Sequence, residues 1–158
     1  MITGGVKSGK SEFALRLADK YFNDKYFLAT AEAFDDEIRK KIEKHKKDRP
    51  ESFITIEEPI HIEKFIRNDL LLDCITLWLN NLFHYNIVDK WEEILDDFLK
   101  QSKDRLIIVT NETGMGNIPP DRASREYNNI LGAANKKIAE RMDLVYLMIS
   151  GLPLKIKG

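Results

Sequence analysis

The sequence predicts an α/β fold in which a doubly wound, mainly parallel sheet carries helices on both faces. Three observations lead to this prediction. Short apolar runs, typical of fully buried strands, recur along the chain and alternate with amphipathic helical patterns. A glycine-rich loop lies between the first apolar residues and the first helix. The 158 residues have the length of one domain and contain no repeat or long linker. We therefore expect one domain over residues 1–158, with ligands at the carboxyl ends of its strands.

The individual elements are predicted from their local patterns. The first helix follows the glycine-rich loop and has an apolar stripe that includes Phe13, Leu17 and Phe22. Only three residues precede Gly4, so the strand leading into the loop is either short or cut by the start of the sequence. Further strands are predicted at 26–30, 53–56, 70–73, 106–110 and 144–149, with an edge strand at 151–158, and further helices at 35–47, 62–66, 76–85, 88–102 and 121–142.

Composition narrows the classes of function. The chain has 25 basic and 26 acidic residues, so no general attraction to nucleic acid or to an anionic membrane is expected. Cys74 is the only cysteine, which excludes an intrachain disulfide and suits a reducing compartment. No apolar run approaches the roughly 20 residues that span a bilayer, and the loop begins too early to leave room for a signal peptide. These features predict a cytoplasmic domain without a membrane span.

The glycine-rich loop fits the P-loop pattern G-x-x-x-x-G-K-S/T. Gly4 and Gly9 permit backbone conformations that a Cβ would forbid, so that successive N–H groups can converge on phosphate oxygens. Lys10 supplies positive charge to the β- and γ-phosphates, and the Ser11 hydroxyl is a ligand for Mg²⁺. The alternative is a glycine-rich turn with an incidental Lys-Ser pair. We predict a P-loop NTPase-type domain whose phosphate-binding residues are Gly4, Gly5, Val6, Lys7, Ser8, Gly9, Lys10 and Ser11.

Acidic residues end three of the predicted strands. Asp73 has the placement of a Walker B acid, which holds Mg²⁺ or orients its waters; the alternative is an ordinary strand-terminating Asp. Glu57 follows another strand and could reach the same crevice or remain a surface acid. Glu112 follows the strand at 106–110 and opens a glycine-rich loop, which is either functional or simply flexible.

One histidine also has a candidate chemical role. His45 falls on the helix at 35–47, where Phe34, Ile38 and Ile42 share its predicted inward stripe, and lysines surround it. The pattern is compatible with a structural histidine beside a solvated basic face. It is also compatible with a nucleophile, because neighbouring cations favour the neutral imidazole and can hold a triphosphate. The acids at 35–37 are expected to cap this helix, and His61 and His84 are expected to be structural.

Several segments together resemble one family, the bifunctional adenosylcobinamide kinase / adenosylcobinamide-phosphate guanylyltransferases of cobalamin biosynthesis. The resemblance covers nearly the whole chain, and the series of P-loop, His-x-x-x-Arg-Pro and Asn-Glu-x-Gly-Met-Gly motifs is highly specific. The matching segments are 3–11, 29–37, 45–50, 73–82, 110–116 and 150–155.

The resemblance implies an activity and a set of site residues. It implies that adenosylcobinamide is phosphorylated on its aminopropanol arm, with GTP and ATP as nucleotide substrates, and that His45 then attacks the α-phosphate of GTP. The resulting GMP–histidine intermediate passes GMP to the new phosphate. The further residues implied to contact nucleotide are Ala29, Thr30, Ala31, Lys46, Lys47, Asp48, Arg49, Glu57 and Asp73.

Departures from the family pattern and two rival hypotheses accompany this reading. Lys7 stands where Arg is usual, Thr113 where Val is commoner, and Asn128-Asn129 where Arg-Asp is common.

The rivals are a monofunctional P-loop small-molecule kinase with a structural His45, and a nucleotide-dependent switch or binding module. Members that resemble this chain form trimers, so the resemblance also implies a homotrimer.

Overall fold

The structure is a computed structural model that describes residues 1–34, 36–102, 105–116 and 118–158; within the helix at 36–48 the side chains at 37, 38, 41, 44, 45 and 48 are left out. In chain order its elements are β1 (Ile2–Gly4), α1 (Lys10–Tyr21), β2 (Tyr26–Ala29), α2 (Asp36–Asp48), β3 (Ile54–Glu57), η1 (Ile62–Phe65), β4 (Leu70–Asp73), α3 (Ile75–His84), η2 (Val88–Lys90), α4 (Trp91–Gln101), β5 (Leu106–Val109), α5 (Arg122–Arg141), β6 (Val145–Ile149) and β7 (Leu152–Lys157).

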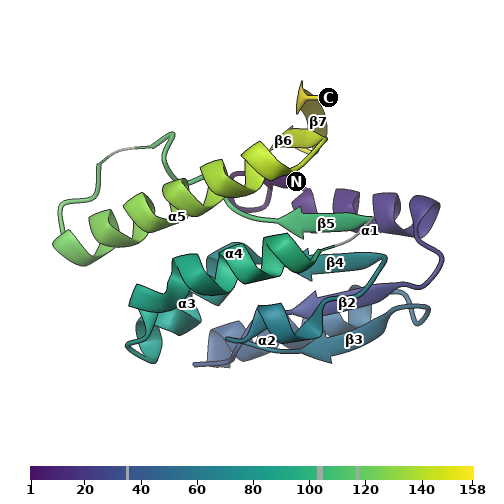
Figure 1. Cartoon of the computed structure of the whole chain (residues 1–158), viewed down its shortest axis with the longest axis horizontal. Coiled ribbons are helices and arrows are strands. Elements are labelled where there is room, and N and C mark those ends of the chain that lie inside the picture. Colours follow the sequence, from purple (N-terminus) through teal and green to yellow (C-terminus); the bar gives the residue numbers. More distant parts are fainter. Residues whose placement is uncertain (35, 103–104, 117) are drawn as a thin grey trace.

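The strands form one seven-stranded sheet in the order β3-β2-β4-β5-β1-β6-β7 (Figure 1). All neighbouring pairs are parallel except β6 and β7, which form an antiparallel hairpin. Ser150 and Gly151 make its two-residue turn, and both have the positive φ angles that a type I′ turn requires. The predicted α/β class with a mainly parallel sheet is therefore confirmed.

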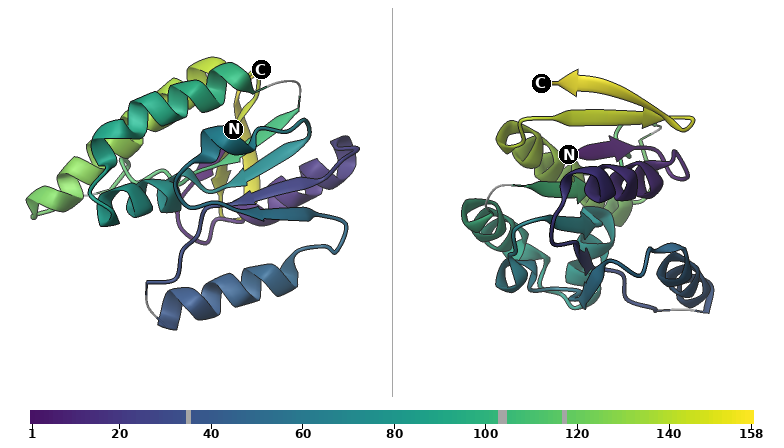
Figure 2. Two further views of the ribbon diagram at one scale, coloured as in Figure 1. Left: turned by 60° about the horizontal axis from the view of Figure 1, so that its bottom comes forward. Right: turned by 90° about the vertical axis from the view of Figure 1, so that its right-hand side faces the viewer.

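Helices cover both faces of the sheet because the buried strands send alternate side chains to opposite sides. On one face, Leu70 and Leu72 pack into a core with residues of α3, α4 and α5. On the other face, Leu71 packs with Ala14 and Ala18 of α1. The two layers are visible in Figure 2, where α1 lies on the side of the sheet opposite α4 and α5.

Two predicted helical features differ from the structure. The predicted helix at 88–102 is divided into a 3₁₀ turn, η2, and α4, a common arrangement at helix ends. Helix α2 lies beyond the β3 edge, apart from the other helices (Figure 2). Phe34 precedes this helix and is 40% exposed, and Ile42 is only half-buried, so these two residues do not form the predicted inward stripe. The side chains of Ile38 and His45 are outside the described residues.

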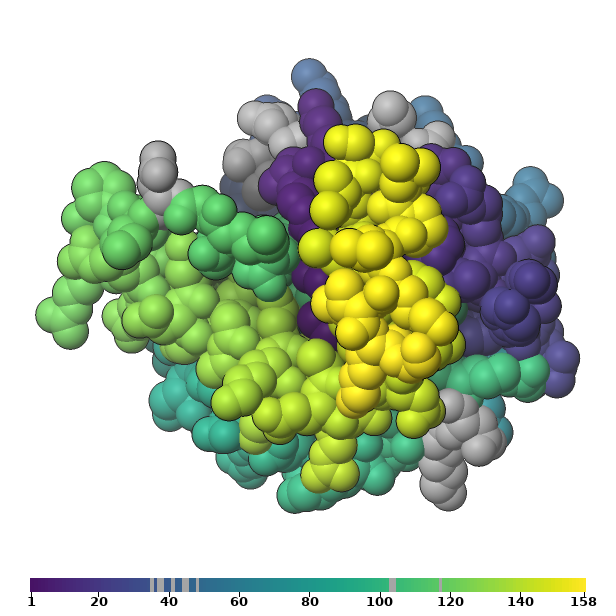
Figure 3. All heavy atoms as spheres, turned by 90° about the horizontal axis from the view of Figure 1, so that it is seen from above, coloured from purple at the N-terminus to yellow at the C-terminus, as the bar shows by residue number. Residues whose placement is uncertain are grey.

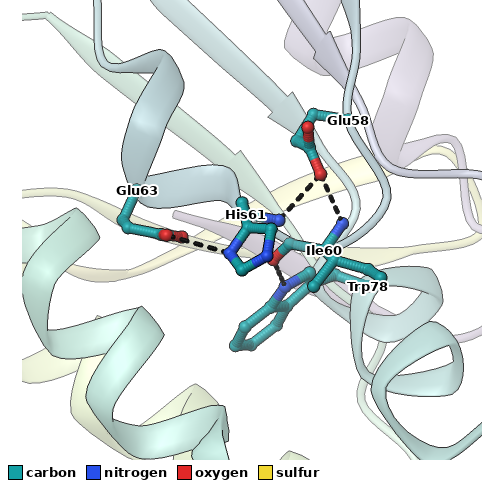
Figure 4. Close-up of polar contacts among 5 residues, drawn as sticks. All are labelled: Glu58, Ile60, His61, Glu63 and Trp78. Atoms are coloured by element: carbon teal, nitrogen blue, oxygen red, sulfur yellow. Dashed lines mark hydrogen bonds and ion pairs between the residues drawn. The ribbon is translucent and has the colours of Figure 1, made fainter. Parts of the chain in front are cut away.

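The segment after β3 is held against α3 by the polar contacts drawn in Figure 4. The Glu58 carboxylate accepts hydrogen bonds from the backbone N–H groups of Ile60 and His61 at 2.9 and 2.8 Å. The Trp78 indole donates to the Ile60 carbonyl at 2.8 Å. His61 is half-exposed and pairs with Glu63 at 3.1 Å. The contacts of Glu58 and Trp78 therefore fix the path of the chain between β3 and η1.

Candidate functional site

The P-loop connects β1 to α1 at the carboxyl edge of the sheet. Gly4 and Gly9 have φ angles of 143° and 90°, which disfavour any residue with a Cβ. A Cβ on Gly4 would also lie 2.4 Å from the Met148 carbonyl oxygen, whereas one on Gly5 would meet nothing within 4 Å. The Ser8 carbonyl accepts a hydrogen bond from Gly151 N–H at 3.1 Å, so the β6–β7 turn supports the loop. The loop conformation therefore depends on Gly4 much more than on Gly5.

Lys10 and Ser11 lie in the first turn of α1, where the P-loop pattern places them. Lys10 is 8% exposed, and its ammonium donates a hydrogen bond to the Gly5 carbonyl at 2.6 Å. Burial lowers the pKa of Lys10, and the neighbouring Cys74 and Asp73 oppose that shift. The negative charge of Asp73 therefore reaches the P-loop lysine.

The residues around the P-loop fit a nucleotide phosphate with Mg²⁺. Ser8 Oγ is buried and has no hydrogen-bond partner among the described residues. Mg²⁺ in phosphate-transfer sites is usually held by one or two protein oxygens together with substrate phosphates and water. Ser11 and Asp73 offer a hydroxyl and a carboxylate of that kind. The described residues contain no group of three or more His, Cys, Asp or Glu that could form an all-protein metal site.

A second cluster of charged residues lies at the β3 edge. Lys46 of α2 pairs with Glu57 at 2.5 Å, and the Arg49 guanidinium donates to the Thr55 hydroxyl at 2.5 Å. Arg49 also stacks over the Phe27 ring, 3.5 Å from its centroid. Burial lowers the pKa of Arg49, and the charges of Asp73 and Glu57 oppose the shift. This cluster borders a hollow of about 290 Å³.

Backbone register explains how the two clusters are connected. Ala29 of β2 pairs with both Glu57 and Asp73, and Asp73 pairs with Val109 of β5, so these strand ends are level. Asp73 ends β4, which is two strands from β3 and two from β1, and therefore lies between the clusters. Neighbouring strands are about 4.8 Å apart, so β3 lies roughly 19 Å from β1 across four intervals. The predicted site residues thus share one edge but occupy two groups.

The β2 end forms the floor between these groups. Ala29 and Ala31 are half-buried, whereas Thr30 is fully buried. The Thr30 hydroxyl donates to the Cys74 carbonyl at 2.7 Å and accepts from the Cys74 N–H at 2.9 Å. Thr30 therefore joins β2 to the start of α3, and its hydroxyl is already engaged.

Other predicted residues differ in what can be said of them. Val6 is 77% exposed on the loop, and Lys7 has a left-handed φ of 57°. Lys47 is exposed on α2. The backbones of His45 and Asp48 belong to α2, but their side chains are outside the described residues.

Sequence reasoning missed the buried amide that joins three of the segments at this edge. Asn81 of α3 is 1% exposed, and its side-chain NH₂ donates to the carbonyls of Thr30 and Pro59 at 2.7 and 2.9 Å. An amide in the apolar pattern of α3 was the available signal, because buried polar groups need partners.

Comparison with known proteins places these features in context. The family described as cobinamide kinase / cobinamide phosphate guanyltransferase matches residues 1–156. The bifunctional adenosylcobalamin biosynthesis protein CobP of Pseudomonas aeruginosa is 38% identical over 167 residues, which cover 100% of this chain and 96% of that protein. The proteins named CobU of Escherichia coli and Salmonella typhimurium are 32% and 34% identical, over 99% of this chain and 98% of each relative. Among the described residues, no helix is long and apolar enough to cross a membrane.

Proposed function

The chain belongs to the cobinamide kinase / cobinamide phosphate guanyltransferase family of enzymes, and on this premise we propose a two-step reaction for it. First, the aminopropanol hydroxyl of adenosylcobinamide receives the γ-phosphoryl group of ATP or GTP. Then GMP passes from GTP to the new phosphate through a GMP–histidine intermediate on His45, which gives adenosyl-GDP-cobinamide.

The P-loop carries the kinase half of this proposal. Phosphoryl transfer depends mainly on positioning and on neutralising the phosphate charge. The buried Lys10 beside Asp73, at the end of a loop shaped by Gly4, supplies both. Ser11 and Asp73 would hold Mg²⁺, which would add positive charge against the β- and γ-phosphates when bound.

The cluster at the β3 edge supports the guanylyltransferase half. His45 precedes Lys46 on α2, and Arg49 follows them in the same basic segment. In the proposed step, a nitrogen of His45 bonds to the α-phosphorus of GTP and pyrophosphate leaves. A phosphate oxygen of the acceptor then attacks the same phosphorus, the N–P bond breaks and the imidazole is regenerated. Lys46 and Arg49 would stabilise the phosphate charge during both transfers.

A homotrimer also belongs to the proposal. The P-loop and the His45 segment lie at different positions along the edge, so a neighbouring subunit could bring one to the other. The C-terminal strand β7, yellow in Figure 3, lies exposed at the outer edge of the sheet. Its side chains include Leu152, Leu154 and Ile156, which are 72, 53 and 57% exposed. An open edge of this kind is suited to pairing with another chain. A trimer predicts a solution mass three times 18.4 kDa by light scattering.

Product analysis tests the two halves separately. Wild-type protein with ATP, GTP, Mg²⁺ and adenosylcobinamide should form adenosylcobinamide phosphate and then adenosyl-GDP-cobinamide, as separated by chromatography and mass spectrometry. His45→Ala should stop at the phosphate, and Lys10→Met should form neither product. Continued formation of adenosyl-GDP-cobinamide by His45→Ala would contradict the histidine route. A wild-type protein that stops at adenosylcobinamide phosphate would favour a monofunctional kinase with a structural His45. Absence of any transfer by the wild type would favour a nucleotide-dependent switch.

A further inference from the structure

We propose that Glu112 is the general base of the kinase half, a role that rests on the proposed function. Glu112 follows β5, which is the strand directly beside the P-loop strand β1. Its backbone N–H donates a hydrogen bond to the Gly4 carbonyl at 3.0 Å. The residue is therefore fixed against the first glycine of the phosphate-binding loop.

The Glu112 carboxylate is held in a defined place by its own loop. Oε1 accepts a hydrogen bond from the Gly114 N–H at 2.8 Å, and the side chain is half-buried. A Cβ on Gly114 would lie 3.1 Å from this oxygen, so glycine leaves room for the carboxylate. The carboxylate that would accept the proton is therefore held in one position by its own loop.

A buried polar network anchors the backbone on which Glu112 lies. The Thr110 hydroxyl donates to Asn135 Oδ1 at 2.7 Å, and the Asn135 NH₂ donates to the Asn111 carbonyl at 2.9 Å. The Asn111 N–H in turn donates to the Thr76 hydroxyl at 2.9 Å. Thr110 and Asn135 are 0 and 6% exposed. The end of β5 is therefore tied to both α3 and α5 by satisfied buried hydrogen bonds, which preorganise a catalytic group.

The neighbouring helices add two more contacts to this anchor. The Tyr127 hydroxyl of α5 donates to the Thr76 carbonyl at 2.8 Å. Thr113 follows Glu112 directly, and its hydroxyl donates to Asn128 Oδ1 of α5 at 3.0 Å. The loop is thus fastened on both sides of Glu112.

Other acids at the same edge have different engagements. The negative charge of Asp73 raises the pKa values of Lys10 and Arg49 and so opposes the effect of their burial. Glu57 ends β3, which is four strand intervals from β1, and pairs with Lys46 of α2. Glu32 accepts a hydrogen bond from the Tyr85 hydroxyl at 2.8 Å. Of these four acids, Glu112 is the one that follows the strand next to the P-loop strand β1.

The proposed step moves one proton and one phosphoryl group. A Glu112 carboxylate oxygen takes the proton of the aminopropanol hydroxyl as the hydroxyl oxygen bonds to the γ-phosphorus. The bond between the γ-phosphorus and the bridging oxygen breaks, and its electron pair leaves with the nucleoside diphosphate. The proton then passes from Glu112 to water.

The first test replaces the carboxylate and measures both half-reactions. Glu112→Gln should lower kcat for phosphorylation of adenosylcobinamide by about 10²-fold or more, the usual range for loss of a general base, with KM for ATP unchanged. Transfer of GMP to supplied adenosylcobinamide phosphate should remain at the wild-type rate. Phosphorylation within threefold of wild type would overturn the role, and so would an equal loss of both activities. If the wild-type protein phosphorylates no adenosylcobinamide, the kinase half of the proposed function fails and the role of Glu112 fails with it.

The second test displaces the carboxylate without removing it. Gly114→Ala should lower kcat for phosphorylation several-fold, because its Cβ must push Glu112 Oε1 by a few tenths of an ångström. Gly116→Ala is the matched control in the same loop, since its Cβ would meet only the Thr113 carbonyl oxygen, at 4.0 Å. Equal rates for the two alanine variants would overturn the proposed placement.

Discussion

Replacing Gly4 by alanine tests whether the P-loop is built as the structure shows. The new Cβ would lie 2.4 Å from the Met148 carbonyl oxygen and 3.0 Å from Ser8 Oγ. Met148 O belongs to the backbone of β6, so a side-chain rotation cannot relieve the contact. The φ of 143° adds backbone strain of about 1–3 kcal/mol for a residue with a Cβ. Strain and contact together should lower the free energy of unfolding by about 3 kcal/mol.

Calorimetry or thermal circular dichroism can measure this loss. In a domain of this size, 1 kcal/mol moves Tm by about 2–4 °C, so Gly4→Ala should melt about 6–12 °C below wild type. Gly5→Ala is the matched control, because its Cβ meets nothing within 4 Å, and its stability should stay within about 0.5 kcal/mol of wild type. A Gly4→Ala protein that melts within about 2 °C of the Gly5→Ala control would refute the reasoning.

Three further predictions concern buried groups around the sheet. Asp69→Ala should cost about 1–3 kcal/mol in urea unfolding, because the N–H groups of Asn23 and Asp24 lose the buried carboxylate that accepts from them at 2.8 and 3.1 Å; an unchanged midpoint would contradict this. Asn81→Leu should cost about 2–4 kcal/mol by leaving the Thr30 and Pro59 carbonyls unpaired, and a stability equal to wild type would show that they find other donors. Burial raises the pKa of Cys74 to about 12, so the native thiol should resist a disulfide reagent at pH 8 and react once unfolded; rapid native labelling would oppose the shift.

Local patterns were sufficient to predict most of the fold. The apolar runs at 70–73 and 106–110 are buried strands because leucine, isoleucine and valine fill both faces of a parallel sheet. The P-loop could be predicted because local backbone geometry requires Gly4 and Gly9, and because phosphate binding requires the charge of Lys10. The position of Asp73 could be predicted because an acid that ends a buried parallel strand lies at the carboxyl edge of the sheet, where ligands bind.

Features that depend on strand order could not be predicted in this way. The position of β5 between β4 and β1 results from long-range packing, and only this order brings Glu112 to the Gly4 carbonyl. The same order places β3 four strand intervals from β1. Local patterns do not contain this order, so they could not indicate that the two parts of the predicted site lie apart. Helix α2 has the periodicity of an inward-facing helix, but it lies beyond the edge of the sheet (Figure 2). Phe34, which precedes it, contacts His84 of α3, with ring centroids 4.1 Å apart.

Buried polar side chains were the other features that local patterns did not reveal. Asn135 and Asn81 occur on helices that the sequence predicts from their apolar stripes, and their partners are carbonyl groups of distant loops. Asp69 accepts from the N–H groups of Asn23 and Asp24, on a turn 45 residues earlier. A polar residue in an apolar stripe signals a buried partner, but only the tertiary structure identifies it.

The guanylyl–histidine step is the central claim, and covalent labelling tests it most directly. Purified protein is incubated with Mg²⁺ and α-³²P-labelled GTP, denatured, and separated by electrophoresis beside His45→Ala. We predict an acid-labile, hydroxylamine-sensitive label on the wild type, located by peptide mapping at His45, and no label on the variant. A wild-type protein that binds GTP but acquires no label, or a label that persists in His45→Ala, would contradict the account.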